Sequence, residues 1–406
     1  MRIDPDRISA DIDAIAAFTE TPGAGCSRPT FTLPWVAARD YVIDAARRAG
    51  CHHRVDAAGN IHIRPAALRW QDSAWLSGSH IDSVPHGGKF DGVTGVVVPL
   101  EILRAAHDAG VVAPLETVVF AEEEGTTFGL GMLGSRAWCG TLSPDDLAAV
   151  RNRDGADYLS AGRGFGVDPA RMGVERLDPT RYRGLIEVHV EQGPAMWEQD
   201  IAVAIVTAIA GRRQYVCTIR GLANHAGSTP MGYRRDALVG AAHCVHSIEH
   251  LPTGLGPGAV ATVGRMIVRP NAVNVIPDCV EFTVDLRAPT DTALVAGDGI
   301  LRSLVAGVCD DRKLSHQLRC TEQLPVVGMD STVCDRLRAA SVKCGVGKPV
   351  ATSSGALHDA AIVAPFLPTA MLFVASRDGV SHNPDEYSRI EDIALAARIV
   401  AEAVMA

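Results

Sequence analysis

The stretch AWLSGSHIDSVPHGGKFDGVTGVVVPLEILRAAHDAG, residues 74–110, determines the fold that the sequence predicts. It opens with a short apolar run at Ala74–Leu76, passes through a polar, glycine-rich turn, and continues with helical periodicity from Gly92 to His107. Working outward, a second helical pattern and three β-rich runs cover Pro34–Ala49, Glu116–Ala121, Leu185–Val190 and Ala370–Val374. Strands that alternate with helices indicate an α/β sheet, in which functional groups gather at the carboxyl ends of strands.

The segment from about Gly211 to Gln323 has a different order of elements. We expect strand, helix, strand, strand, helix and strand over Gln214–Arg220, Arg234–Ile248, Ala259–Ile267, Cys279–Arg287, Thr290–Cys309 and Leu314–Arg319. This βαββαβ order is typical of a ferredoxin-like unit, which can fold as an insert and leave a sheet edge free for pairing. The sequence therefore predicts one domain made of residues 1–210 and 325–406, interrupted by a second at 211–324.

Composition narrows the possible partners. The 406 residues include 38 Lys+Arg and 47 Asp+Glu, a formal net charge of −9 without any basic block, which argues against nucleic acid and anionic membrane surfaces. No uninterrupted apolar run reaches the length of a membrane span. The acidic, amphipathic start favours a cytoplasmic protein. Ten scattered cysteines predict reduced and mostly buried thiols.

Polar residues follow the first apolar run directly. If that strand continues through Ser79–Ser83, His80 and Asp82 project from one face, so that the carboxylate orients the ring while its other nitrogen binds a metal. Asp91 stands at the glycine-rich turn, where its two oxygens could bridge two cations. Considered alone, Asp91 is better explained as a cap of the helix that begins near Gly92.

Three carboxylates, Glu122–Glu124, end the run Val118–Ala121. Burying them is costly unless a cation neutralises them. One can bind a metal while its neighbour takes a proton from activated water and returns it to a leaving nitrogen. A solvated loop end is the alternative interpretation.

The other two β-rich runs, Leu185–Val190 and Ala370–Val374, each have a candidate histidine in or after them. Alternation places Glu187, His189 and Glu191 on one face, a pattern that a solvent-facing strand would also show. His382 follows the last run, and a lone loop histidine is more often a surface residue. Considered jointly, the candidates form a mixed imidazole and carboxylate set that suits zinc or manganese, with enough ligands for two ions and one bridging carboxylate. The set is His80, Asp91, Glu124, His189 and His382.

Ten ordered motifs run through nearly the whole chain: Gly78–Pro85, Gly87–Gly92, Glu123–Gly125, Gly134–Arg136, His189–Pro194, Ala223–Met231, Arg234–Ala237, Asn271–Pro277, Asp285–Arg287 and Ser354–Ala360. Together they resemble the M20 family of dinuclear metallohydrolases, in particular its hydantoinase/carbamoylase branch. This branch includes N-carbamoyl-L-amino acid hydrolases, β-ureidopropionases and allantoate amidohydrolases. The resemblance implies an aminopeptidase-like α/β catalytic domain with a mixed sheet between helices, and an inserted ferredoxin-like domain that forms a homodimer.

The resemblance also implies roles for the metal-site residues. His80, Glu124, His189 and His382 would hold two divalent ions (zinc, manganese, cobalt or nickel), with Asp91 between them. Glu123 would be the general base, and Asp82 the partner of His80. His189 matches carbamoylase-like members, whereas related peptidases carry a carboxylate at that position.

For the substrate, the resemblance implies that His225 of the Asn-His-Ala-Gly motif stabilises the oxyanion, in some members across the dimer. Asn274 and Arg287 would hold a substrate carboxylate, which suits the planar fork of arginine. Further pocket candidates are Gln192, Gln214 and His358. Alternatives remain: Arg287 could pair with Asp285 at the surface, His225 could be an ordinary loop residue, and His358 a local hydrogen-bond partner.

Three positions depart from the family pattern. Thr127 stands where an arginine is usual, Leu357 precedes His358, and the order Arg212–Tyr215 is unusual. Changed charge and shape near a pocket alter the choice of substrate.

We therefore predict a metal-dependent amidohydrolase that cleaves the carbamoyl or ureido group of an N-carbamoyl-L-amino acid or related ureido acid. A deacylase or dipeptidase acting on N-acyl amino acids is the nearest alternative. A metal-free binding protein on the same fold is a third, and the complete ligand set argues against it.

Overall fold

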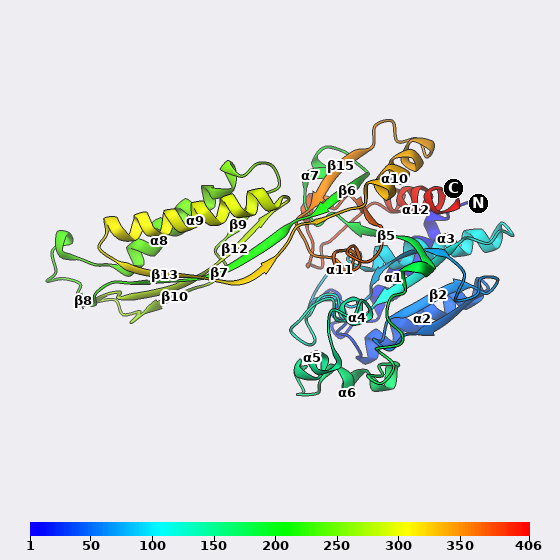
Figure 1. The fold of residues 1–406 in the computed structure, drawn as a ribbon, viewed down its shortest axis with the longest axis horizontal. Coiled ribbons are helices and arrows are strands. Elements are labelled where there is room, and N and C mark those ends of the chain that lie inside the picture. The colour runs from blue at the N-terminus through cyan, green and yellow to red at the C-terminus, as the bar shows by residue number, and fades with distance from the viewer. The chain divides into compact units, whose positions relative to one another are not determined.

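The computed structural model describes all 406 residues, which form two compact units (Figure 1). The first consists of Met1–Thr207, Gly328–Thr352 and Leu357–Ala406, and the second of Ala208–Val327 with Ser353–Ala356. The unit borders lie within three residues of those drawn from the sequence at 210/211 and 324/325, apart from the short segment 353–356. Separate folding of the insert stays a prediction.

The first unit is built on a large mixed sheet. Its strands lie in the order β1 (Cys51–Val55), β2 (Ile61–Pro65), β4 (Leu115–Phe120), β3 (Ala74–His80), β5 (Tyr182–Val190), β16 (Thr369–Val374), β6 (Val203–Ile209) and β14 (Val327–Gly328), and β15 (Val350–Ser354) pairs with β6. The four central strands β4, β3, β5 and β16 are parallel. Their carboxyl ends therefore meet at one edge of the sheet.

Helices cover this sheet. Five of them contribute to one large apolar core, namely α1 (Pro5–Ala17), α2 (Leu33–Arg48), α3 (Val93–Asp108), α10 (Ser331–Lys343) and α12 (Ile390–Met405). The shorter helices are α4 (Leu133–Trp138), α5 (Pro144–Ala149), α6 (Tyr158–Gly162), α7 (Ala195–Glu198) and α11 (Asp359–Val363). α1 begins where Asp4 accepts hydrogen bonds from the backbone N–H groups of Asp6 and Arg7, with Pro5 at the first position.

One strand ends earlier than expected. β3 ends at His80 and does not continue to Ser83, so the expectation that His80 and Asp82 alternate on one strand face is wrong. β3 is buried throughout and lies between β4 and β5, whereas residues 81–83 already belong to the loop that leads to α3. Asp82 is therefore positioned by that loop.

The second unit contains a separate antiparallel sheet in the order β10 (Met266–Arg269), β12 (Cys279–Ala288), β7 (Gly211–Arg220) and β13 (Ser315–Leu324), with β9 (Val260–Thr262) also pairing with β12. A small two-stranded sheet joins β8 (Asn224–His225) and β11 (Val275–Ile276). The strand expected at Ala259–Ile267 is divided into β9 and β10. The interruption includes Gly264, a residue that weakens strand interiors.

Two helices, α8 (Ala237–His250) and α9 (Asp291–Asp311), pack on this antiparallel sheet and share its apolar core (Figure 1). α8 begins later than the predicted Arg234 because Asp236 caps it, accepting hydrogen bonds from the N–H groups of Leu238 and Val239. By length and composition alone, α9 is long and apolar enough to cross a membrane, although Asp298 and Arg302 interrupt its apolar residues. However, its buried residues recur at helical spacing and face the core of this unit.

All ten cysteines are free thiols, and seven of them are buried.

A buried ionic cluster supports the outer half of the large sheet. The Glu116 carboxylate contacts His62 Nδ1 at 2.7 Å and Arg64 Nε, and it accepts a hydrogen bond from the Tyr182 hydroxyl at 2.8 Å. Although burial disfavours the carboxylate, these partners lower the pKa of Glu116 to about 2.

We expect Glu116→Gln to lower the free energy of unfolding by about 3 kcal/mol, because it leaves the buried Arg64 guanidinium without a counter-charge. The Glu116 contribution is present above pH 4.5, its usual pKa, and is lost as the pH falls toward about 2. Denaturant unfolding followed by tryptophan fluorescence at pH 7 measures the change. The exposed Glu249→Gln is the matched control, and equal midpoints for both variants would contradict the expectation.

Candidate metal centre

The candidate ligands lie at the shared edge formed by the carboxyl ends of the parallel strands. His80 is the last residue of β3, and His189 is the next-to-last residue of β5. Glu123 and Glu124 follow β4, and His382 follows β16. His80, Glu124, His189 and His382 thus lie at or after the ends of four different central strands, whereas Asp91 lies in the loop between β3 and α3.

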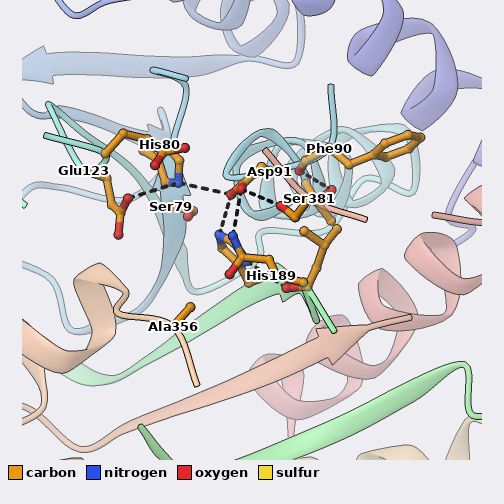
Figure 2. Close-up of polar contacts among 12 residues, drawn as sticks. Ser79, His80, Phe90, Asp91, Glu123, His189, Ala356 and Ser381 are labelled. Atoms are coloured by element: carbon orange, nitrogen blue, oxygen red, sulfur yellow. Dashed lines mark hydrogen bonds and ion pairs between the residues drawn. The ribbon is translucent and has the colours of Figure 1, made fainter. Parts of the chain in front are cut away.

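Asp91 lies between two sets of donors (Figure 2). Its Oδ1 atom is 3.1 Å from Nε2 of His189 and 3.7 Å from Nε2 of His80. Its Oδ2 atom is 3.2 Å from Nε2 of His382, and this nitrogen is 3.5 Å from Oε2 of Glu124. One carboxylate therefore presents one oxygen to each set, which is the arrangement required of a bridging ligand.

The turn before α3 explains the position of Asp91. Gly92 is the N-cap residue, with a φ of 66°, and no side chain caps the helix. A β-carbon on Gly92 would overlap the His80 ring. Only glycine meets both conditions. The alternative that Asp91 caps the helix is therefore wrong, because its oxygens instead face His80, His189 and His382.

Backbone carbonyls orient the two buried histidines. Nδ1 of His80 is 3.0 Å from the carbonyl oxygen of Asp82, and Nδ1 of His189 is 2.9 Å from that of Val190. With the proton on Nδ1, each Nε2 keeps a lone pair directed at the site, as a metal ligand needs. The Asp82 carboxylate is farther from His80, at 3.7 Å, and instead accepts a hydrogen bond from the Glu124 N–H at 3.1 Å.

The three consecutive glutamates have different surroundings. Glu122 is fully buried and accepts hydrogen bonds from the backbone N–H groups of Thr127 and Phe128, so its role is structural. Glu123 points to His80, with Oε2 at 3.7 Å from Nε2, and Glu124 points to His382. Because the Glu123 and Glu124 side chains are only 10% and 6% exposed, the alternative of a solvated loop end is wrong.

The electrostatics show an excess of buried negative charge. Burial, reinforced by the charge of Glu124, raises the pKa of Glu123 well above its usual value. Burial together with the charge of Asp91 raises the pKa of Glu124 to about 8, and burial raises that of Asp82 to about 6. A divalent cation would supply the missing positive charge.

The two buried histidines have pKa values that are shifted in opposite directions. Burial lowers the pKa of His80 to about 4, which keeps its ring neutral and able to bind a metal. Burial opposes charging of His189 too, but its contact with Asp91 raises its pKa to about 9. A cation between the same atoms would replace those protons. The imidazole and carboxylate donors, without thiolates, suit zinc- or manganese-like ions.

Two further candidates border this site. Gln192 donates a hydrogen bond from Nε2 to Oδ2 of Asp91 at 2.8 Å. The His358 ring is buried, with its centroid 4.4 Å from that of His189, and burial lowers its pKa well below the usual value. Both residues thus adjoin the candidate metal ligands.

Thr127, one of the departures from the family pattern, accepts a hydrogen bond from the Thr30 N–H. It lies in the loop that holds Glu122.

The remaining candidates lie in the second unit. Arg287 donates from Nε to Oδ1 of Asp285 at 2.8 Å and from Nη1 to the Gly355 carbonyl at 2.9 Å. Gln214 donates to the other Asp285 oxygen at 3.1 Å. The Asp285 pair considered as an alternative is therefore present, and both partners are only partly exposed, at 29% and 26%.

His225 belongs to the two-stranded sheet of the second unit, and Asn274 directly precedes the other strand of that sheet. His225 pairs with Val275, and the Ala226 N–H donates to the Asn274 carbonyl at 3.0 Å. Nδ1 of His225 accepts hydrogen bonds from the N–H groups of Gly227 and Ser228, at 3.0 and 3.1 Å. The proton of the neutral ring is therefore on Nε2, which remains a donor on an exposed side chain.

Asp285, expected only as a possible surface partner of Arg287, also binds Gln214. Two further residues near the metal ligands had no predicted role. Ser381 and Glu386 contact Asp91 and its loop, with Ser381 Oγ at 3.1 Å from Asp91 Oδ2. No local pattern signals Glu386, because its partners are distant in sequence.

Known proteins similar to this chain are metal-dependent hydrolases, as the donor atoms of the site suggest. Residues 76–406 match the family described as peptidase family M20/M25/M40. The chain is 37% identical to an N-carbamoyl-L-amino acid amidohydrolase of Geobacillus stearothermophilus, over 93% of this chain and 92% of that protein. It is 31% identical to an allantoate amidohydrolase of Escherichia coli K12, over 95% and 94% respectively.

A solved structure gives the same result. The crystal structure of an amidase of the hydantoinase/carbamoylase family from Burkholderia multivorans covers 99% of this chain and 97% of its own, with a TM-score of 0.89 and 34% identity. The chain therefore belongs to the metal-dependent M20 family, in its hydantoinase/carbamoylase branch. It is an amidohydrolase that acts on C–N bonds.

Asp91→Asn should reduce binding at both donor sets together, because each set loses the charge of its shared ligand. Elemental analysis after dialysis should find about two divalent ions in the parent and well below one in the variant. Asp385→Asn, at an exposed carboxylate in the His382 loop, is the control and should keep both ions. An Asp91→Asn variant that retains two ions would exclude the bridging role.

Proposed function

We propose that this protein hydrolyses the carbamoyl or ureido group of N-carbamoyl-L-amino acids or related ureido acids. The observation that carries the proposal is the Asp91 carboxylate between two donor sets, with Glu123 beside it. The family relatives named for N-carbamoyl-L-amino acids and allantoate support this substrate class.

His80 and His189 would hold one ion, and Glu124 and His382 the other, with Asp91 shared. Two divalent ions (zinc, manganese, cobalt or nickel) would supply Lewis acidity that polarises a carbonyl and lowers the pKa of water. The fit rests on the donor atoms and on the excess of buried carboxylates that only a cation would balance. It also argues against a metal-free binding protein.

Glu123 is the proposed general base. Its carboxylate would take a proton from the attacking water as the new C–O bond forms, and would then pass that proton to the leaving nitrogen as the C–N bond breaks. Cleavage of the terminal amide of a ureido acid releases ammonia and leaves a carbamate, which loses carbon dioxide to give the amine. Asp82 supports this arrangement through the backbone of Glu124.

His225 is the proposed oxyanion donor. Its Nδ1 already accepts two backbone hydrogen bonds, so Nε2–H is directed outward to stabilise developing negative charge. We propose that the protein is a homodimer formed through its ferredoxin-like second unit, and that His225 stabilises the oxyanion in this dimer. We also propose that the protein is cytoplasmic. The βαββαβ order of that unit supports the dimerisation domain.

Arg287, with Asn274, is the proposed binding site for the substrate carboxylate. Asp285 and the Gly355 carbonyl fix the guanidinium on one side, and its remaining terminal N–H groups can pair with a carboxylate. Gln214 is held by the same Asp285, while Gln192 and His358 adjoin the metal ligands. These three are proposed pocket contacts.

Glu123→Ala should lower kcat for N-carbamoyl amino acids by about 10²–10⁴-fold, since a general base contributes this much, while both ions remain bound. Ammonia release by the metal-loaded enzyme measures the rate, and elemental analysis verifies the metal content. Parental activity in a folded, metal-loaded variant would refute the proposal. In the same assay, amine release from N-acyl amino acids or dipeptides without ammonia from ureido acids would indicate a deacylase or dipeptidase.

Arg287→Lys should raise KM for ureido acids by about tenfold or more, because lysine cannot pair bidentately. The corresponding amides, which lack the carboxylate, should be hydrolysed equally by parent and variant. Arg265→Lys, at an exposed ion pair with Glu281 in the same unit, should leave KM unchanged. An unchanged KM in Arg287→Lys would assign carboxylate recognition to other residues.

A further inference from the structure

Glu386 is a buried carboxylate in the loop that carries His382, and it has no part in the proposed chemistry. It is 4% exposed. Its Oε2 atom accepts hydrogen bonds from the backbone N–H groups of Phe90 and Asp91, at 2.8 and 3.0 Å. Glu386 therefore binds the backbone of the residue that both donor sets share.

A second connection runs through Ser381. Its Oγ is 2.8 Å from Oε1 of Glu386 and 3.1 Å from Oδ2 of Asp91, so the hydroxyl lies between the two carboxylates. Figure 2 shows Ser381 beside Asp91, on the side away from His80. Glu386 thus fixes the Asp91 backbone directly and adjoins its side chain through one hydroxyl.

A glycine leaves room for this carboxylate. A β-carbon on Gly88 would overlap Glu386, so the absence of a side chain there creates the space that it occupies. The N-terminus of α3 favours negative charge at this point. The glycine-rich turn Gly87–Gly92 is in this way shaped around Glu386 as well as around His80.

The Glu386 loop is itself well anchored. The Tyr387 ring packs edge-on against Phe90, with centroids 6.0 Å apart. The Tyr387 carbonyl accepts a hydrogen bond from the Arg377 N–H, and the Ser388 hydroxyl donates to the Ala375 carbonyl, both at 2.8 Å. A rigid loop can transmit its position to Asp91.

We propose that Glu386 is a positioning residue that sets the Asp91 carboxylate between the two donor sets, with Gly88 providing its space. The proposal rests on the metal-dependent function proposed above and deepens it. Without the acceptor, two buried N–H groups lose their partner and the turn relaxes. Because Asp91 is common to both sets, affinity for both ions falls together.

The test compares Glu386→Leu, which removes the acceptors, with Glu386→Gln, whose amide oxygen can still accept both N–H groups. Gly88→Ala displaces Glu386 without altering it, and Gly347→Ala, at a position open to solvent, is its control. Metal-free proteins are titrated with Mn²⁺ by calorimetry, and the visible absorption of Co²⁺-loaded forms reports the coordination geometry. Circular dichroism of the metal-free forms verifies folding.

We expect both Mn²⁺ affinities to fall about 10–100-fold in Glu386→Leu and Gly88→Ala, with an altered Co²⁺ spectrum. Glu386→Gln should remain near the parent, as should Gly347→Ala. If Glu386→Leu does not fold, Gly88→Ala and Glu386→Gln decide the question.

Parental affinity in folded Gly88→Ala or Glu386→Leu would overturn the positioning role, as would a Glu386→Gln variant as weak as Glu386→Leu. Both outcomes leave the proposed function standing if the parent binds two ions. A parent that binds no divalent ion would overturn both proposals.

Discussion

The sharing of the Asp91 carboxylate between two histidine-containing donor sets is the interaction on which the rest of the site depends. A carboxylate can serve two sets only if its backbone, its rotamer and both neighbouring rings are fixed. Gly92 lets the His80 ring approach, backbone carbonyls fix the tautomers of His80 and His189, and parallel strands bring the ligands to one edge. Residues from distant parts of the sequence thus fix the position of the Asp91 carboxylate.

Burial of like charges is the cost of this design. Burial disfavours the charged form of a carboxylate, and neighbouring carboxylates add repulsion, so the pKa values of Glu123 and Glu124 are raised. Adjacent residues nevertheless acquire different roles, because Glu123 faces His80 and Glu124 faces His382. Position around the shared carboxylate, more than residue type, separates the proposed base from the proposed ligand.

Much of this could be predicted from the sequence. The candidate ligands were expected at strand ends, and the structure brings them close together because parallel strands end at one edge of the sheet. The sequence could not show that β3 stops at His80, since the loop and its neighbours decide this. It also could not reveal Glu386, whose backbone partners Phe90 and Asp91 lie 296 and 295 residues away along the chain. Local patterns predicted strands and ligands, whereas long-range hydrogen bonds depend on tertiary structure.

The order of the ligands along the chain has a consequence for assembly. His80, Asp91, Glu124 and His189 precede the second unit, whereas His382 and Glu386 come from the last part of the sequence, after β16 has joined the sheet beside β5. During synthesis, the first donor set can be complete while the second still lacks its histidine. A nascent chain therefore becomes competent for two ions only after the segment that follows the second unit has been synthesised and β16 has paired with β5.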